Sequence, residues 1–493
     1  STMGSTNRGI SWWEFTKATD EPETWFPQFY YVGCRYLEAR LTPAQEGAAL
    51  PRLESLEGVI VHSAAAPAGE FSCSNPLLNR IRELVRWAQR ANMVSVLTDC
   101  PHREKLGWLE QYHLNGPAIR YEYDLARLFT KGMNDMAEAQ LEDGLVPNIA
   151  PEYTEFKGPF RAAAEWGAAF ILVPWQQYLF CGDVQLLKRH YPAMKRYFAW
   201  LESRAADHLL QDGLGDWFDL GPNKPGKAQL TPPEVTASAF YFYDALTLSR
   251  IAQVLGFPED ARQFADKAEA IRARFNERFF DPDRGQYGSG SQCANALPLA
   301  MGIVEERHRP AVLSALVRDL ESRGFATSAG DIGFRFVLRA LADAGRSDVI
   351  HRMVTQDRQP GYAYMLKQGA TSLTESWDAN LTTSHNHFML GQVTEWLYHD
   401  LAGIAPDPDG PGFQRILIKP QPVRELRWVK ASYDSLPGRI ESEWQLDRDQ
   451  FRLRVKIPPN TTATIHLPGA AGPGTPASPF QAGSGEHVFQ SRL

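Results

Sequence analysis

The stretch Asn75-Pro-Leu-Leu-Asn-Arg-Ile-Arg-Glu-Leu-Val-Arg-Trp-Ala88 decides the fold class, because it opens a long helical part of the chain. Asn75 is a residue type that caps a helix N-terminus, and Pro76 is tolerated in the first helical turn. Behind this start, apolar residues recur at helical spacing, namely Leu77, Leu78, Ile81, Leu84, Val85 and Ala88. We therefore expect an amphipathic helix to begin here.

Further helical patterns continue from this first helix to residue 401. They cover residues 117–141, 161–180, 184–205, 234–255, 259–279, 308–322, 334–344 and 387–401. Loops with Gly, Pro and Asp separate them, and no strand patterns alternate with them. This order excludes a doubly wound α/β sheet and leaves a helical barrel, a solenoid or a large bundle. No repeat of fixed period is visible, which disfavours the solenoid.

The two ends of the chain have strand-like patterns instead. Segments 29–37 and 58–62 are short and rich in aromatic and β-branched residues, so we expect strands there. The Gly- and Pro-rich segment 403–412 has the composition of a linker. After it, apolar residues alternate along 440–446 and 451–457, with a turn between them. We expect the tail to form a β-domain.

Length and composition narrow the class of protein. A chain of 493 residues exceeds one ordinary core, so two or three domains are expected. The sequence has no apolar run long enough to span a bilayer, which argues against a membrane anchor. Its net charge is −7 and it has no Lys/Arg cluster, which argues against a nucleic-acid-binding surface. The five cysteines include no Cys-x-x-Cys pair, so we expect neither disulfides nor a zinc or redox site. An uncharged substrate agrees better with this net charge than a polyanion does.

The first candidate catalytic residue is Glu104, in the stretch Thr98-Asp-Cys-Pro-His-Arg-Glu-Lys-Leu-Gly-Trp108. Pro101 discourages a helix, so we expect a loop between two helices. A general acid needs its pKa raised toward the working pH by partial burial or by a nearby carboxylate. The competing interpretation is a surface ion-pair cluster formed by Asp99, Arg103, Glu104 and Lys105. The residue types taken alone favour this interpretation.

The second candidate is Glu375, in the stretch Gly369-Ala-Thr-Ser-Leu-Thr-Glu-Ser-Trp-Asp378. Cleavage of a glycosidic bond uses one carboxylic acid and one carboxylate on opposite sides of the sugar ring, so a pair of such residues is informative. The competing interpretation is an ordinary helix start with capping hydroxyls. His385 and His387 follow, but His-x-His without a third well-spaced ligand is a weak metal signal. We therefore expect no metal.

Two further stretches could form aromatic platforms for a sugar ring. Glu165-Trp-Gly167 lies at an expected helix start, and Gly215-Asp-Trp217 lies in an expected loop. Glycine beside tryptophan lets the backbone approach a ligand closely. For each stretch alone, packing of the tryptophan between inner helices is an equally good interpretation.

Taken in order, these motifs resemble the inverting α-L-rhamnosidases of glycoside hydrolase family 78. The likeness is carried by residues 73–79, 99–108, 165–167, 173–175, 215–217, 369–378 and 386–397. The resemblance implies a mainly α protein with an (α/α)6 barrel flanked by β-sandwich segments. It implies three domains: residues 1–72 as the last part of a preceding sandwich, 73–402 as the catalytic barrel, and 403–493 as a C-terminal sandwich.

The resemblance also implies a role for each motif residue. Glu104 is similar to the family's general acid, and Glu375 to the general base that activates water. Residues at positions that would hold the terminal sugar are Asp99, Arg103, Trp108, Trp166, Trp217, Trp377 and His387. The implied activity is exo-acting release of α-L-rhamnose, with inversion, from a rhamnose-containing glycoside or oligosaccharide. It needs no metal or cofactor, and we expect a soluble protein of the bacterial cytoplasm or periplasm.

Two positions depart from the family pattern. Many members have Asp where this chain has Gln111, after Glu110, and Asp where it has Ala168. Both changes touch expected sugar contacts. They keep open a related barrel hydrolase acting on another deoxy or uronic sugar. A catalytically silent carbohydrate-binding protein is a further alternative, against which the retention of both glutamates argues.

Overall fold

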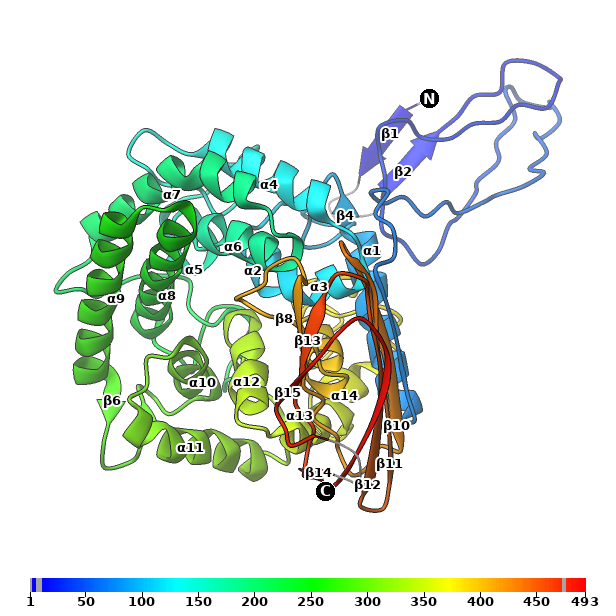
Figure 1. Cartoon of the computed structure of the whole chain (residues 1–493). Helices are drawn as coiled ribbons and strands as arrows, with labels where there is room; N and C mark the ends of the chain where they lie inside the picture. Colours follow the sequence, from blue (N-terminus) through cyan, green and yellow to red (C-terminus); the bar gives the residue numbers. More distant parts are fainter. Residues whose placement is uncertain (1, 6–10, 472–475) are drawn as a thin grey trace.

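The helices of this chain form a barrel of two layers (Figure 1). The computed structural model describes residues 2–5, 11–471 and 476–493. Each inner helix contacts the next, and the last returns to the first; in ring order they are α2 (Glu110–Leu114) with α3 (Gly116–Glu122), α6 (Ala169–Cys181), α8 (Pro233–Leu255), α10 (Gln292–Met301), α12 (Asp331–Asp343) and α15 (Val393–Trp396). The outer layer consists of α1 (Pro76–Ala91), α4 (Ala126–Ala139), α7 (Val184–Arg204), α9 (Pro258–Phe279), α11 (Arg309–Ser322) and α13 (Ser347–Thr355).

The two layers differ in how their helices distribute apolar residues. Inner helices α6, α8 and α10 are buried along most of their length and on most faces. Outer helices such as α1 are amphipathic, with one apolar stripe toward the inner ring and charged residues toward solvent. At the start of α1, the side chain of Asn75 accepts a hydrogen bond from the Leu77 amide at 2.9 Å. The predicted cap and the mainly α barrel are confirmed.

The helix boundaries deviate from the sequence patterns at two places. The pattern over 117–141 divides into α3 and α4, and the one over 387–401 begins only with α15 and continues as a π-helix (Leu397–Leu401). Sequence patterning missed four helices, namely α2, α10, α13 and α14 (Tyr362–Lys367). All four are short. α2 and α10 are also buried all round, so these two helices show no amphipathic period. Within the described ranges, no helix is long and apolar enough to cross a bilayer.

The C-terminal part is a β-sandwich packed beside the barrel (Figure 1). One sheet has the strand order β14-β16-β12-β11-β10-β3 and the other β15-β13-β9-β8. The strands are β3 (Gly69–Cys73), β8 (Ile404–Pro406), β9 (Arg415–Ile418), β10 (Trp428–Ser435), β11 (Gly438–Asp447), β12 (Gln450–Ile457), β13 (Thr462–Ile465), β14 (Ala470–Ala471), β15 (Phe480–Ala482) and β16 (Gly485–Arg492). The alternation predicted along 440–457 is confirmed as the β11–β12 hairpin, in which Asp447 pairs with Gln450.

Two strand-level expectations near the ends of the barrel were wrong. Segments 29–37 and 58–62 contain no strand; Phe29 and Val59 are largely exposed, and no sheet packs on them. The segment expected to be a linker, 403–412, instead contributes β8 to the smaller sheet.

Shorter strand pairs are β1 (Thr2–Ser5) with β2 (Ser11–Glu14), β4 (Met93–Val94) with β5 (Val96–Leu97), and β6 (Phe280–Asp281) with β7 (Gln286–Tyr287). All five cysteines are free thiols.

One buried arginine joins the barrel to the sandwich. Arg82 of α1 donates to both carboxylate oxygens of Glu122, at 2.7 and 2.8 Å, and to the hydroxyl of Tyr398 at 3.0 Å. It also donates to the carbonyl oxygens of Gly69 and Phe71 in β3, each at 3.3 Å. A single side chain therefore holds together the first hairpin of the barrel, its last helix and the edge strand of the larger sheet.

Replacing Arg82 with Met is expected to lower the free energy of unfolding by about 3 kcal/mol, because it leaves the buried carboxylate of Glu122 with Arg86 as its remaining ion-pair partner among the described residues. Urea unfolding followed by circular dichroism measures the loss. The control is Arg80→Met on the same helix, an exposed arginine without an ion pair among the described residues, whose change should cost less than about 1 kcal/mol. Equal losses for the two variants would show that the Arg82 network does not hold the junction.

Candidate active site

Two loops from opposite ends of the barrel sequence meet at one mouth. The loop before α2 carries Glu104, and the loop before α15 carries Glu375. The Phe388 amide donates to the carbonyl oxygen of Asp99 at 3.1 Å. The Arg103 guanidinium donates to the carbonyl oxygen of Thr382 at 3.0 Å, across 279 positions of sequence. Closure of the inner ring thus brings the two candidate glutamates to the same rim.

Glu104 lies in an exposed turn, as its sequence predicted. The indole N–H of Trp108 donates to its Oε2 at 3.1 Å, and Oε1 has no hydrogen bond from the described residues. Beneath the turn, burial and then the neighbouring Asp99 raise the pKa of Cys100 to about 12. One carboxyl oxygen of Glu104 is therefore free of hydrogen bonds from the described residues, and the thiol next to the turn is neutral.

The alternative of a surface ion-pair cluster is wrong. Within the described residues, no ion pair joins Asp99, Arg103, Glu104 and Lys105 to one another. Arg103 is engaged with the backbone of Thr382 instead. Lys105 donates to the carbonyl oxygen of Tyr31 at 2.6 Å, and its ammonium lies 4.6 Å from the centre of that ring. The charged stretch is therefore organised around loop contacts and not around mutual neutralisation.

Glu375 is fixed by reciprocal hydrogen bonds with Ser384. Its amide donates to the Ser384 carbonyl oxygen at 2.9 Å, and its Oε2 accepts from the Ser384 amide at 2.7 Å. Described residues 368–392 contain no helix, so the helix-start interpretation is wrong. Burial, followed by Arg103, lowers the pKa of His102, and Glu375 partly opposes this. The Glu375 carboxylate therefore acts on the turn that carries Glu104.

Asp99 and His387 form a buried pair at the base of these loops. Oδ1 of Asp99 accepts from the Leu106 amide at 2.9 Å, while Oδ2 has no partner among the described residues. Burial raises the pKa of Asp99, against the opposing effect of His387. Burial lowers the pKa of His387 to about 4, against the opposing effect of Asp99, and its Nδ1 also lacks a described partner. At neutral pH the imidazole is uncharged, which suits hydrogen bonding to sugar hydroxyls.

The same pair belongs to a group of potential metal ligands. Donor atoms of Asp99, Cys100 and His387 lie within 4.8 Å of one another. Metal binding requires cysteine as the thiolate, and the raised pKa of Cys100 opposes that form. Asp99 and His387 also offer a buried oxygen and a buried nitrogen that can bond hydroxyl groups.

Aromatic rings form a row that begins beside Glu104. The distances between neighbouring ring centres are 5.2 Å from Trp108 to Phe156, 6.3 Å from Phe156 to Phe160, and 5.4 Å from Phe160 to Trp217. Trp217 lies in a loop, as its sequence predicted. Phe156 and Phe160 were missed from the sequence because they lie outside any motif, Phe156 in a loop and Phe160 at the end of the short 3-10 helix Gly158–Phe160. Their only signal was a pair of aromatic residues four positions apart in a segment with no helical pattern.

The structure corrects the assignment of Trp377 to the sugar site. Trp377 is fully buried, and its indole N–H donates to the carbonyl oxygen of Ala329 at 2.9 Å. It packs edge to face on Phe334 and Tyr362. Trp377 therefore anchors the Glu375 loop to the core and presents no surface to a ligand. Trp166 in α5 (Ala164–Gly167) is also buried, but its indole N–H has no described partner.

Two buried carboxyl groups hold the loop that carries Trp217. Glu165 accepts from the Gly215 amide at 3.1 Å and from the Thr236 hydroxyl at 2.6 Å, and burial raises its pKa to about 7. Asp216 accepts from the amides of Gly330 and Gly333 at 3.0 and 2.8 Å. These bonds tie the loop to α5 and α12. Sequence analysis singled out both acidic residues only as neighbours of tryptophan.

The two departures from the family pattern have different structural outcomes. Glu110 is buried and accepts from the Gln111 side-chain amide at 2.6 Å. Burial, with further contributions from Asp99 and Glu104, raises the pKa of Glu110 to about 8, so it is largely protonated at neutral pH. A carboxyl group therefore stands next to the altered position. Ala168 is completely buried and its side chain offers no polar atom.

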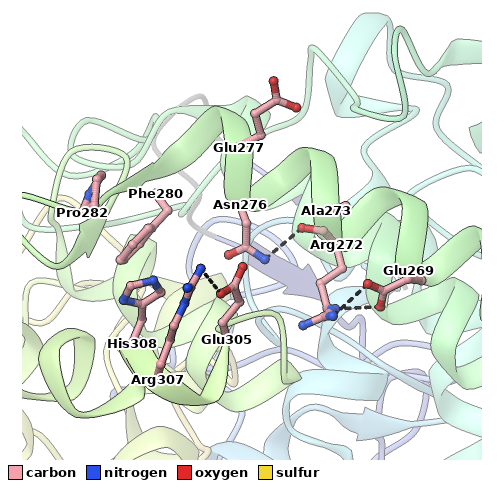
Figure 2. A pocket seen from close by; sticks show the side chains of 10 residues that line it. All are labelled: Glu269, Arg272, Ala273, Asn276, Glu277, Phe280, Pro282, Glu305, Arg307 and His308. Atoms are coloured by element: carbon pink, nitrogen blue, oxygen red, sulfur yellow. Dashed lines mark hydrogen bonds and ion pairs between the residues drawn. The ribbon is translucent and has the colours of Figure 1, made fainter.

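Two cavities lie apart from the residues described above. One, of about 410 Å³, is lined by α9, β6 and residues 305–308 (Figure 2). In it, Arg272 pairs with Glu269 and Arg307 with Glu305, so both guanidinium groups are already neutralised. The other, of about 460 Å³, is lined by residues 222–229, directly after the Trp217 loop. The first shares no residue with the candidate site.

Comparisons with family models and with known proteins match this chain over most of its length. Residues 66–401 match the family model of the bacterial alpha-L-rhamnosidase 6 hairpin glycosidase domain, and residues 403–477 match that of the bacterial alpha-L-rhamnosidase C-terminal domain. An alpha-L-rhamnosidase of Streptomyces avermitilis is 32% identical over 458 residues, which cover 90% of this chain and 42% of the relative. One from Formosa agariphila is 26% identical over 455 residues, which cover 90% of this chain and 48% of that relative. The chain thus spans about half the length of these curated relatives.

Solved structures give the same result. An alpha-L-rhamnosidase from Dictyoglumus thermophilum superimposes with a TM-score of 0.83 at 30% identity, covering 90% of this chain and 52% of its own. The Streptomyces avermitilis enzyme complexed with L-rhamnose superimposes with a TM-score of 0.80 at 31% identity, covering 87% of this chain and 43% of its own.

The buried imidazole of His387 is expected to make stability depend on pH. Between about pH 6.5 and pH 4 the unfolded chain takes up a proton at His387 and the folded chain does not, so its contribution to the free energy of unfolding falls as pH falls. This loss reaches about 3 kcal/mol at most. His387→Gln should therefore lose less stability than the wild type over this range in urea titrations. His487→Gln in the exposed part of the sandwich is the control; a wild-type profile parallel to that of His387→Gln would contradict the assignment.

Proposed function

This chain belongs to the bacterial α-L-rhamnosidase family, glycoside hydrolase family 78, and we propose on that basis that it releases a terminal α-L-rhamnose from glycosides or oligosaccharides. The observation that carries the proposal is the meeting of the Glu104 and Glu375 loops at one mouth of the barrel. A relative of known structure, 31% identical, is complexed with L-rhamnose, which supports the choice of sugar.

The mechanism that we propose assigns one step to each glutamate. Glu104 donates its proton to the glycosidic oxygen as the bond from that oxygen to the anomeric carbon breaks. The Trp108 N–H holds Oε2, so Oε1 is available for this transfer. Glu375, held through Oε2 by the Ser384 amide, takes a proton from the water that attacks the anomeric carbon. Inversion requires the two carboxyl groups to stand roughly 6.5 to 9.5 Å apart.

The sugar contacts that we propose follow the polarity of the site. Asp99 and His387 each keep a buried polar atom without a described partner, and they bind hydroxyl groups together with Arg103. Trp108 and Trp217, which are partly exposed, supply apolar surface for the ring face and for the 6-methyl group, whereas the buried Trp166 supplies none. No step of this mechanism calls for a metal or an organic cofactor.

The proposed catalytic unit is the barrel at residues 73–402, followed by a sandwich at 403–493. Residues 1–72, expected to be the last part of a preceding sandwich, contain only β1, β2 and most of β3 among their described strands. β3 lies across the first boundary and pairs with β10, so the C-terminal sandwich includes a strand from before the barrel. We therefore propose that barrel and C-terminal sandwich fold as one unit.

A second candidate function is hydrolysis of another deoxy or uronic sugar. It is favoured by Ala168, where a buried methyl group stands in place of the family's carboxylate. A panel of nitrophenyl glycosides decides between the candidates. Turnover of the α-L-rhamnoside well above that of the fucoside, arabinoside and glucuronide supports rhamnose; binding of rhamnose with no turnover of any member would identify a silent binding protein.

Glu104→Gln and Glu375→Gln are each expected to lower kcat by about 10²- to 10⁴-fold. The Glu104 variant should retain more activity on dinitrophenyl rhamnoside than on an alkyl rhamnoside, because a good leaving group needs less protonation. The Glu375 variant should be slow on both. Glu155→Gln, an exposed glutamate of a neighbouring loop, is the control and should keep near wild-type turnover. Near wild-type turnover by either active-site variant would remove that residue from its role.

The first product released should be the β-anomer of rhamnose, because water attacks the face opposite the departing group. Proton NMR during the first minutes of turnover, before mutarotation, records the anomer. Initial appearance of α-rhamnose would exclude inversion by this pair.

A further inference from the structure

A segment that precedes the barrel contacts both loops that carry the proposed catalytic glutamates. The Gly33 amide donates to the carbonyl oxygen of Pro101, in the loop before α2, at 3.1 Å. The approach is close, because a Cβ atom at Gly33 would lie 2.7 Å from Cγ of Pro101. The Arg35 guanidinium donates to the Thr371 hydroxyl, in the loop before α15, at 3.2 Å. Residues 30–35, which we call the strap, therefore belong to the surroundings of the site.

The strap encloses the ammonium group of Lys105, the residue directly after Glu104. This ammonium lies 4.2 Å from the centre of the Tyr30 ring and 4.6 Å from that of the Tyr31 ring. It also donates to the carbonyl oxygen of Tyr31 at 2.6 Å. Both rings are within the roughly 6 Å at which a cation is attracted to an aromatic ring. Two rings and a carbonyl oxygen therefore form a cage for this cation.

The backbone of the turn also holds Lys105 in place. Lys105 has a φ of 55°, in the left-handed region that residues with a Cβ atom rarely adopt. Such a conformation is unfavourable and persists where surrounding contacts maintain it. Its carbonyl oxygen accepts a hydrogen bond from the hydroxyl of Tyr153, whose pKa is raised by burial to about 12. Tyr153 therefore fixes the backbone of Lys105, and the cage fixes its side chain.

A free Lys105 would oppose the role proposed for its neighbour. A cation beside a carboxyl group favours the carboxylate, whereas a general acid must carry a proton at the working pH. Within the described residues, neither Lys105 nor Glu104 forms an ion pair. The cage therefore gives this cation partners other than the carboxyl group next to it in sequence.

We propose that Tyr30 and Tyr31 are positioning residues, whose cage keeps the ammonium of Lys105 away from Glu104 so that the acid retains the proton it donates. This inference rests on the proposed function and deepens it, because it assigns control of the acid to a segment outside the barrel. The effect of the two rings on the reaction passes through Lys105.

Other titratable and charged groups also act on Glu104 or on its turn, namely Asp99, Cys100, His102, Arg103, Glu110 and Glu375. Burial raises the pKa of Asp99 and of Glu110, and it lowers the pKa of His102. The Arg103 guanidinium is bound to the carbonyl oxygen of Thr382. All of these groups are retained in the variants below, so a change in the pH profile that depends on Lys105 reports on the cage.

The test measures kcat/KM against pH for an alkyl rhamnoside, because this substrate needs a protonated acid. In Tyr30→Leu/Tyr31→Leu the released Lys105 should pair with Glu104. The alkaline limb of the profile should then move to lower pH by about 0.3 to 0.7 units, the size expected of an exposed ion pair. Above this limb, kcat/KM should be about two- to fivefold below that of the wild type.

Two further variants separate the rings from their hydroxyl groups and from their surroundings. Tyr30→Phe/Tyr31→Phe keeps both rings but removes the hydroxyl of Tyr31 that contacts Thr98, and it should keep the wild-type limb. Phe29→Leu/Tyr36→Leu is the matched control, because it removes two exposed rings on either side of the cage, and it should also keep the wild-type limb. A limb that moves equally in the phenylalanine pair would contradict a role of the rings.

Removal of the cation separates this role from support of the fold. Adding Lys105→Met to the leucine pair should return the alkaline limb to its wild-type position or to slightly higher pH. An unshifted limb in the leucine pair, or a shift that persists in the triple variant, would overturn the proposal.

Failure of the cage and failure of the proposed function are distinguishable. Acetylation by acetic anhydride, followed by peptide mass spectrometry, reports on the cage without any turnover. In the wild type, Lys105 should react about three- to fivefold more slowly than Lys188, an exposed lysine on α7, and the leucine pair should remove this difference. Equal reactivity in the wild type contradicts the cage. A protected Lys105 in a protein that cleaves no rhamnoside contradicts the proposed function alone.

Discussion

The packing of α15 against α3 closes the inner ring, and the position of each proposed catalytic group depends on that closure. Buried ion pairs hold the last helix in place: Arg335 donates to both oxygens of Glu395 at 2.8 Å, and Arg339 bonds Asp400 at 2.6 Å. Removing one partner of such a pair leaves an uncompensated buried charge, so alternative arrangements of the last helix are costly. Ring closure therefore brings residues from the two ends of the barrel sequence next to each other.

The mouth that results is held through backbone groups as much as through side chains. Glu375 is clamped by the amide of Ser384, and the two loops are bridged by bonds to the carbonyl oxygens of Asp99 and Thr382. The backbone groups in these bonds do not titrate, so they hold their positions while the carboxyl groups exchange protons. In the proposed mechanism each glutamate keeps one oxygen anchored and one available, which orients the carboxyl group without committing its proton.

Aromatic residues divide between support and recognition according to burial. Trp377 has a satisfied indole N–H and no exposed surface, so it supports the Glu375 loop. Trp108 and Trp217 are partly exposed, and the rings of Phe156 and Phe160 connect them along the rim. The same residue type next to an acidic group thus serves two purposes, and only its surroundings tell them apart.

Local sequence determined the features that depend on neighbours in the chain: the capped start of α1, the amphipathic outer helices, the β11–β12 hairpin and the motifs around Glu104 and Glu375. Tertiary structure alone decided the pairing of β3 with β10, the irregular course of residues 29–37 and the burial of Trp377. Periodicity reports which face of a segment is apolar, whereas a strand needs a partner edge and a binding residue needs an opening. Both of these are supplied by segments far away in the sequence, once the ring has closed.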